Sequence, residues 1–285
     1  MLELLSTHTD DAVIEPKQPK KVDGYETDDD IMERLRARFS ILEEMTQAVK
    51  KGHIRSLIVS GPPGVGKSFG VEHVLGKYET FATLANDPSL KKYDIIKGSI
   101  TALGLYAKLY EYSSEKSILV FDDIDSIFHD EVALNLLKGA LDSSKTRRIS
   151  WLSDARMLKT EGIPKTFDFK GGIVFITNLN FDHIKSEKLK PHIAALESRS
   201  LYLDLTINTT RDKMLRIRQI TNDGMLNDYD FTIAEKEDIL NYIDQHKDSF
   251  KELSLRTVIK AADICKSFPY YWKNMADVTI ARRKV

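Results

Sequence analysis

Apolar residues recur along the chain in two alternating patterns, and each pattern predicts its own kind of element. Short apolar runs of strand length are separated by stretches with the helical period of 3.6 residues. We expect strands at 56–60, 93–97, 118–121, 173–177 and 201–205, and helices near 67–75, 100–112, 130–141 and 186–197. Strands that alternate with helices are typical of a parallel sheet covered on both faces. The pattern therefore predicts an α/β fold with a five-stranded parallel sheet.

The two ends of the chain follow other patterns. Residues 1–26 are polar and lack sustained periodicity, which is typical of a flexible arm. Three aspartates at 28–30 can cap a helix whose apolar face runs from Ile31 to Val49, and Gly52 closes it. Beyond residue 208 only helical patterns follow, at 211–222, 232–247 and 254–267. We therefore expect an arm at 1–26, an α/β domain at 27–207 and a small all-helical domain at 208–285.

The first predicted strand leads into a loop that reads Gly61, Pro62, Pro63, Gly64, Val65, Gly66, Lys67 and Ser68. This loop matches the phosphate-binding pattern G-x-x-x-x-G-K-[ST] in its required context of strand, loop and helix. Backbone N–H groups in such a loop converge on phosphate oxygens, Lys67 reaches the β- and γ-phosphates, and Ser68 ligates Mg²⁺. The alternative is a glycine turn with an exposed lysine, which would not need a strand before it and a helix after it. The loop predicts a nucleoside triphosphate site.

An acidic pair, Asp122 and Asp123, directly follows the third predicted strand. Ligands of open α/β sheets bind at the carboxyl ends of the strands. We therefore interpret Asp122 as the metal ligand that joins Ser68. Asp123 would then orient or deprotonate the attacking water. Without the upstream loop, such a pair would be interpreted as a solvated strand end.

From about Asp28 to the C-terminal helices, the chain resembles the AAA+ family of ATPases. The strand that ends in Asn178 is similar to the family's sensor-1 strand, which implies that Asn178 helps to hold the water. The alternative is an asparagine that caps the next turn. Ser198 and Arg199 are similar to the Ser-Arg motif of clamp-loader subunits, which implies that Arg199 is an arginine finger acting in trans. Without this resemblance Arg199 would be a surface cation.

A second arginine, Arg256, lies in a segment that resembles sensor 2 at the start of a lid helix. A cation in a first helical turn is disfavoured by the helix dipole unless an anion compensates it, and a nucleotide phosphate or a nearby carboxylate would serve. The resemblance implies a P-loop NTPase three-layer sandwich with a helical lid, ATP and Mg²⁺ as cofactors, ATP hydrolysis, and a homo-oligomeric ring, a hexamer or pentamer. The family usually has Glu where this chain has Asp123, which implies slower hydrolysis or hydrolysis conditional on assembly.

The interval between Asp122 and Asn178 is longer than one helix and a loop require, which indicates an insertion at 143–172. Alternating apolar and polar residues near its two ends predict a β-hairpin-like element, and seven Lys or Arg residues stand against three acids. In one interpretation it contacts nucleic acid by charge and stacking, through Lys145, Arg147, Arg148 and Trp151. In the other, the hairpin is solvated and its tryptophan packs on its own domain.

Composition adds few constraints. The net charge of −1 excludes a domain-wide basic field, so any nucleic-acid contact must be local. No apolar run reaches membrane-spanning length, the seven histidines are scattered, and Cys265 is the single cysteine. We therefore expect a cytoplasmic protein with no membrane span and no zinc site, in which Cys265 is a core thiol.

Three function classes stay open. The compact size, the Ser-Arg motif and the basic insertion favour an ATP-driven ring that loads or remodels a nucleic-acid or nucleoprotein complex. A protein-remodelling chaperone of the family usually carries a substrate-recruiting N-domain, which residues 1–26 are too short to form. An ATP-binding switch with little hydrolysis is suggested only by Asp123. The residues around Arg148 and Phe175 resemble small AAA+ ATPases of tailed bacteriophages, which implies a bacterial host cytoplasm and a role in support of DNA replication or packaging.

Overall fold

The computed structural model describes residues 26–281, apart from 87–91, 180, 182–185 and 188–189. Apart from Glu26, the arm predicted at 1–26 lies outside these residues. None of the helices in the described part of the chain combines the length and the apolar character that a bilayer crossing needs.

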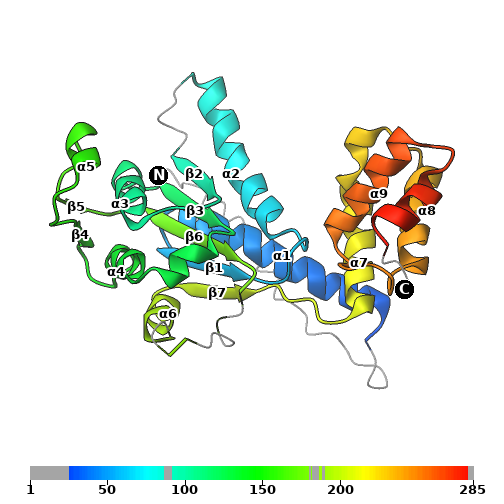
Figure 1. Ribbon diagram of the computed structural model, residues 1–285, viewed down its shortest axis with the longest axis horizontal. Coiled ribbons are helices and arrows are strands. Elements are labelled where there is room, and N and C mark those ends of the chain that lie inside the picture. Colours follow the sequence, from blue (N-terminus) through cyan, green and yellow to red (C-terminus); the bar gives the residue numbers. More distant parts are fainter. Residues whose placement is uncertain (1–25, 87–91, 180, 182–185, 188–189, 282–285) are drawn as a thin grey trace, which may run out of the picture.

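Five strands form one parallel sheet in the order β2-β3-β6-β1-β7 (Figure 1). They are β1 (Ser56–Ser60), β2 (Tyr93–Lys97), β3 (Ile118–Asp122), β6 (Gly172–Thr177) and β7 (Leu201–Asp204). The predicted α/β fold with a five-stranded parallel sheet is confirmed. This order places β6 between β3 and β1, so the residues that follow these three strands meet at one edge of the sheet.

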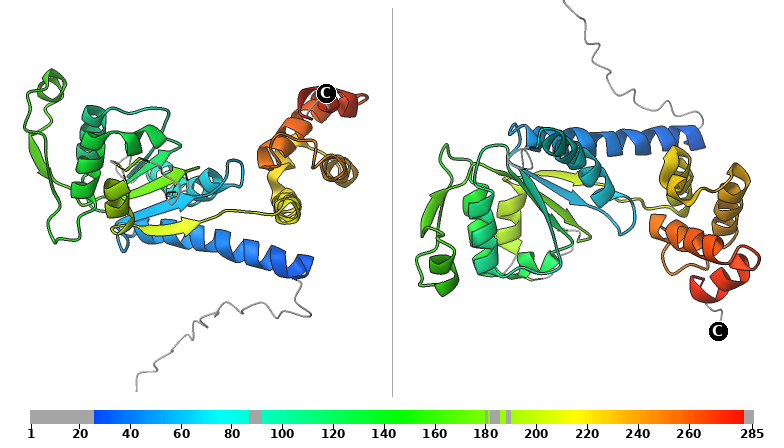
Figure 2. Two further views of the ribbon diagram at one scale, coloured as in Figure 1. Left: turned by 60° about the horizontal axis from the view of Figure 1, so that its bottom comes forward. Right: turned by 90° about the horizontal axis from the view of Figure 1, so that it is seen from above.

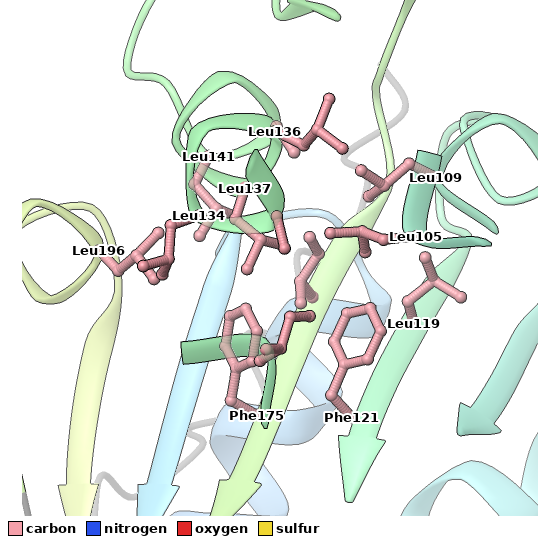
Figure 3. Close-up of a cluster of buried hydrophobic side chains, with 14 of the residues drawn as sticks. Leu105, Leu109, Leu119, Phe121, Leu134, Leu136, Leu137, Leu141, Phe175 and Leu196 are labelled. Carbon is pink, nitrogen blue, oxygen red and sulfur yellow. The ribbon is translucent and has the colours of Figure 1, made fainter. Parts of the chain in front are cut away.

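Three helices, α3 (Ala102–Glu111), α4 (Glu131–Ala140) and α6 (Lys190–Glu197), cover one face of the sheet. Their leucines pack on side chains that alternate along the strands, among them Phe121 and Phe175, whose rings stack 5.6 Å apart (Figure 3). Every residue of β1, β3 and β6 is buried, as expected for the central strands of a covered parallel sheet.

The other face is covered by α1 (Asp28–Lys50) and α2 (Lys67–Leu84). Helix α1 begins in a capping box, because the Thr27 hydroxyl accepts from the Asp30 N–H and the Asp30 carboxylate accepts from the Thr27 N–H. Helix α2 is longer than the predicted 67–75, because it continues through Gly76 to Leu84. Its added turns are anchored where the Tyr93 hydroxyl donates to Glu79, at 2.9 Å.

The C-terminal part is helical: α7 (Thr210–Ile220), α8 (Ile233–Gln245), α9 (Leu255–Ser267) and α10 (Trp272–Thr279) pack around a core of their own. Helix α10 was not predicted, because its eight residues give too short a pattern. Helix α1 extends from the sheet to these helices (Figures 1 and 2). There Arg34 pairs with Asp212 at 3.1 Å, and Arg211 pairs with Asp28.

The insertion forms a separate two-stranded sheet at the end of the molecule remote from the C-terminal helices (Figure 1). Strands β4 (Arg148–Ser150) and β5 (Thr166–Asp168) pair antiparallel, with Ile149 opposite Phe167. Between them lies a short helix that was not predicted, α5 (Arg156–Thr160). Other single turns of helix are η2 (Asp125–His129), η4 (Thr221–Met225) and η5 (Asn227–Tyr229).

Candidate nucleotide site

The loop between β1 and α2 folds around glycines that no other residue could replace without strain. Gly64 has φ +70°, and a Cβ there would lie 2.6 Å from the Cβ of Ser254. The Gly64 carbonyl accepts from the Leu255 N–H at 2.9 Å, so the loop also contacts the start of α9. The close approach of the C-terminal helices to this loop therefore depends on glycine.

Lys67, the first residue of α2, is buried and turns back over the loop. Its ammonium group donates to the carbonyls of Gly61 and Pro62, at 2.7 and 2.9 Å, and to the Asn178 side-chain oxygen at 2.8 Å. Burial lowers the pKa of Lys67, against the opposing charges of Asp123 and Asp122. These three acceptors hold the ammonium group beside the loop, where such a loop would receive a phosphate.

Ser68 and Asp122 meet beside this lysine. The Ser68 hydroxyl donates to Asp122 Oδ1 at 2.9 Å, and Asp122 is buried at the end of β3. A hydroxyl and a carboxylate side by side are oxygen ligands of the kind that Mg²⁺ prefers. The residues present therefore fit the predicted magnesium site, in which Ser68 and Asp122 would be the protein ligands.

Asp123 and Asn178 form the next part of the site. The Asn178 amide donates to Asp123 Oδ1 at 2.8 Å, although 55 residues separate them. Asp123 has φ +55°, a left-handed conformation that aspartate tolerates, and its N–H donates to the Ile176 carbonyl. Burial and the neighbouring Asp122 charge raise the pKa of Asp123. A carboxylate with a raised pKa is a stronger base than a solvated aspartate, which suits the activation of water.

Two further residues support the site and were not singled out in the sequence. Asp125 accepts from the Thr177 hydroxyl at 2.6 Å, and the same hydroxyl accepts from the Leu179 N–H, which fixes the turn that carries Asn178. Lys97, the last residue of β2, lies 3.3 Å from Asp122 Oδ2 and donates to Glu72 at 2.8 Å. Lys97 could have been found from the sequence, because it ends a predicted strand just as Asp122 ends the next one.

A cleft of about 560 Å³ begins at the loop and runs along α1 and the C-terminal helices. Its lining includes Lys67, Asp123, Asn178 and Arg256. Arg256 is exposed in the first turn of α9, and its charge lowers the pKa of both Lys67 and Asp123. The structure thus brings Arg256 toward the predicted phosphate position.

Arg199 lies at the opposite end of the sheet. Ser200 and Ser56, at the starts of β7 and β1, are joined by a hydrogen bond of 2.9 Å, and the loop leaves the other end of β1. Five strand residues span about 16 Å, so Arg199 cannot reach the phosphates bound by its own chain. Arg199 donates to the Ala195 carbonyl at 2.7 Å and lines a hollow of about 410 Å³ with Arg55.

A family model for the ATPase family associated with various cellular activities (AAA) matches residues 57–186. A protein of Enterobacteria phage T4, the uncharacterized 36.7 kDa protein in the nrdC-mobD intergenic region, is 36% identical over 254 residues, which are 88% of this chain and 76% of the phage protein. The chain belongs to the AAA family of ATPases. The resemblances to the AAA+ family and to phage-encoded members are confirmed.

Two solved structures share low sequence identity with this AAA ATPase. The replication initiator DnaA bound to AMPPCP and single-stranded DNA is 12% identical, covers 85% of this chain and has a TM-score of 0.48. NtrX from Brucella abortus in complex with ATP is 11% identical, covers 89% and has a TM-score of 0.46. The chain spans 64% and 54% of the lengths of these two proteins, respectively.

The predicted nucleic-acid contact of Arg147, in the insertion of this AAA ATPase, is wrong. Arg147 is 9% exposed, donates to the carbonyls of Ala140 and Gly171 at 2.9 and 3.0 Å, and lies over the Phe169 ring. Burial lowers its pKa to about 10. Its donors are therefore used by a carbonyl at the end of α4 and by one just before β6, and they are not free to bind a nucleic acid.

The other three residues predicted to touch nucleic acid lie nearer the surface. Arg148 is exposed and donates to Asp168 at 3.0 Å, and Lys145 is exposed. Trp151 is half-buried, with its ring 5.8 Å from that of Tyr106. For Trp151 the structure therefore favours packing on its own domain, the second of the two interpretations.

Proposed function

We propose that this AAA ATPase binds ATP with Mg²⁺ and hydrolyses it as a homo-oligomeric ring. One observation carries the proposal: Lys67, Asp123 and Asn178 are hydrogen-bonded at one edge of the sheet, whereas Arg199 lies at the other. Arg199 can then stabilise a transferring phosphoryl group only in the site of a neighbouring subunit. In a ring of this chain, each site is completed by the Arg199 of the next copy.

Each side chain of the site has a defined task in this proposal. Lys67 and the loop N–H groups bind the phosphates, and Ser68 and Asp122 hold Mg²⁺, which neutralises phosphate charge when bound. Asp123 accepts a proton from the attacking water, and Asn178 keeps that carboxylate in position. The hydrogen bond between Asn178 and Asp123 supports these two roles.

We further propose that residues 208–285 act as a lid whose Arg256 closes on the phosphates. The bond between Leu255 and the Gly64 carbonyl supports this role, because a shift of α9 would change the shape of the loop. Arg256 would be drawn toward a triphosphate, which compensates its unfavourable position in the first turn of α9.

Mixed subunits test the ring. Arg199→Ala and Lys67→Ala proteins should each be nearly inactive alone, because one lacks the finger and the other lacks phosphate binding. When they are mixed, the Lys67→Ala subunits supply Arg199 to intact nucleotide sites, so part of the ATPase rate should return. The specific rate of the wild type should also rise with protein concentration. A flat specific rate together with no recovery on mixing would overturn the action in trans.

The client we propose is a nucleic acid or a nucleoprotein complex, in the cytoplasm of a phage-infected bacterium. The basic insertion at the end of the molecule supports the first part, through Lys145, Arg148 and the exposed Arg156. The phage T4 relative supports the second. Single-stranded DNA, double-stranded DNA and an unfolded protein, added in turn, should show stimulation of the ATPase rate by DNA. Stimulation by the unfolded protein alone would favour protein remodelling instead.

An ATP-binding switch is a second candidate, favoured by the short side chain of Asp123 and its bond to Asn178. Such a protein would bind ATP and keep it intact. A single-turnover experiment with excess enzyme separates the two functions. ADP should form within minutes in a hydrolase, whereas bound ATP that stays intact for hours at high protein concentration would identify the switch.

A further inference from the structure

Arg216 on α7 is a buried cation in the cleft that none of the predicted site roles uses. It is 6% exposed, and its guanidinium carbon lies 3.5 Å from the centre of the Phe39 ring on α1. Both residues line the cleft that begins at the phosphate-binding loop. A buried guanidinium in a ligand cleft is a candidate for direct contact with the ligand.

The hydrogen bonds of Arg216 are incomplete. One terminal nitrogen, Nη1, donates to the Gln219 side-chain oxygen at 2.6 Å. The Nε atom is buried and has no hydrogen-bond partner in the part of the chain that the structure describes. A buried donor without an acceptor is unfavourable, and an acceptor brought by a ligand would relieve it. Gln219 is itself held by the Met32 carbonyl at 3.0 Å, so it orients the guanidinium.

Two acidic side chains of the cleft lining act on Arg216. Their carboxylates, on Asp223 and Glu43, oppose the burial that lowers the pKa of Arg216 to about 10. The opposing charges on Lys67 are different ones, led by Asp123 and Asp122.

The lining of this cleft also includes the apolar side chains of Phe39, Ile220 and Met225. Apolar side chains beside a guanidinium group suit a flat heteroaromatic base.

We propose that Arg216 is a specificity-determining residue that reads the purine base of the bound nucleotide by donating to one of its ring nitrogens. This inference rests on the proposed binding of ATP. Carboxylates of Glu43, Asp223 and Asp228 belong to the lining of the same cleft and can accept from an exocyclic amino group of the base.

A purely structural role for Arg216 makes a different prediction. Its contact with Phe39 joins α7 to α1, so any substitution could loosen the two helices and weaken all nucleotides alike. A base-reading role affects only nucleotides that carry the acceptor. The atoms of the base must therefore be varied together with the side chain.

The experiment measures dissociation constants of ATP and its 1-deaza, 3-deaza and 7-deaza analogues, each of which lacks one ring nitrogen. Wild-type protein is compared with Arg216→Met and with a matched control, Arg218→Met, two residues along α7. Arg218 is paired with Glu237 at 3.1 Å, outside the residues that line the cleft.

We expect one analogue to bind wild type and Arg218→Met about 10-fold more weakly than ATP, while Arg216→Met binds that analogue and ATP equally well. Equal ratios of analogue to ATP affinity in wild type and Arg216→Met, for all three analogues, would overturn the inference.

Other outcomes stay informative. If Arg216→Met does not fold, Arg216→Lys keeps the charge without the planar fork, and it should lose most of the discrimination against the same analogue. Unchanged discrimination in Arg216→Lys would contradict base reading. If the wild type binds neither ATP nor any analogue, the proposed function fails. If it binds ATP and all three analogues equally, only the role of Arg216 fails.

Discussion

The carboxyl edge of the sheet and the β4–β5 insertion are both rich in charge, but they use it differently. At the edge, Lys67 bonds to Asn178, and Asn178 to Asp123, across more than 50 residues of sequence. In the insertion, most charged side chains are bonded to close structural neighbours. Five of its seven cations have such partners: Arg147, Arg148, Lys159, Lys165 and Lys170.

The difference shows that a count of charges does not identify a binding surface. The sheet edge keeps polar groups directed into a cleft, because strands from three parts of the sequence end there. In the insertion, pairs such as Arg148 with Asp168 are solvent-exposed and satisfied within the hairpin. Exposed pairs of this kind contribute about 0–1 kcal/mol to stability. Substitutions in the two regions should therefore affect different measurements.

The largest effect is expected at the edge, from Asp123→Asn. The amide cannot accept the proton of the attacking water, so the ATPase rate should fall roughly 100- to 1,000-fold while ATP affinity stays within about threefold. Asp123→Glu restores the residue usual in the family and should remain active. Asp154→Asn, on an exposed acid of the insertion paired with Lys159, is the matched control and should leave the rate unchanged. Full activity of Asp123→Asn would show that Asp123 is not the base that accepts the proton of the attacking water.

The buried arginine of the insertion, Arg147, should affect stability rather than the ATPase rate. Arg147→Met leaves the Ala140 and Gly171 carbonyls without their donors, so the free energy of unfolding should fall by about 2–3 kcal/mol. Arg148→Ala, one residue along, removes only the exposed pair with Asp168 and should change that free energy by about 0.5 kcal/mol or less. Urea denaturation measures both. Equal losses in the two variants would contradict the division of roles between these arginines.

Lys50 lies outside both regions and shows how burial of a cation alone affects stability. Lys50 is 5% exposed, and burial, with the nearby Lys92 charge, lowers its pKa to about 8. Below pH 8 the charge is present in both folded and unfolded chains and disfavours folding. As the pH rises from 8 toward 10.5, the folded chain loses this proton first, so stability increases.

Lys50→Met removes this dependence. The free energy of unfolding of wild type relative to Lys50→Met should rise by roughly 1–2 kcal/mol between pH 7.5 and pH 10. Urea denaturation of both proteins at each pH cancels the titration of the other lysines. A difference between the two proteins that stays constant over this range would show that Lys50 keeps an ordinary pKa despite its burial.

The sequence indicated the parts of the site that follow from local rules. The phosphate-binding loop is contiguous, and Asp122 and Asp123 follow an apolar run, so the end-of-strand rule placed them at the ligand edge. The five strands were found for a similar reason, since buried parallel strands are short apolar runs. Asn178 was found through family resemblance, and its bond to Lys67 was not expected.

The missed features depend on tertiary contacts. Arg147 looked like any cation of the insertion, and its burial follows from the position of the α4 carbonyls, to which it donates. Arg216 lies among other charged residues of α7, and only the packing of α7 on α1 places it over Phe39. Neither position has a local pattern that separates a buried arginine from an exposed one.

The smallest effect is expected from Lys97, an exposed cation at the sheet edge that lies beside the proposed metal ligand Asp122. Its ammonium group lies 3.3 Å from Asp122 Oδ2, while Ser68 donates to the other oxygen. Lys97→Met removes a partly exposed positive charge, so the negative potential at Asp122 should increase. The Mg²⁺ concentration that half-saturates metal-dependent nucleotide binding should therefore fall by roughly threefold.

Lys108→Met is the matched control for Lys97→Met, because Lys108 also pairs with a β2 residue, Asp94, at 2.9 Å. It should leave the Mg²⁺ requirement unchanged, since Asp94 precedes the ligand edge of the strand. Fluorescent ATP titrated at fixed Mg²⁺ concentrations gives both values without relying on hydrolysis. A weaker Mg²⁺ response in Lys97→Met would mean that Lys97 orients the Asp122 carboxylate more than it neutralises it. An unchanged response would show that the charges near this edge act independently, as they do in the exposed pairs of the insertion.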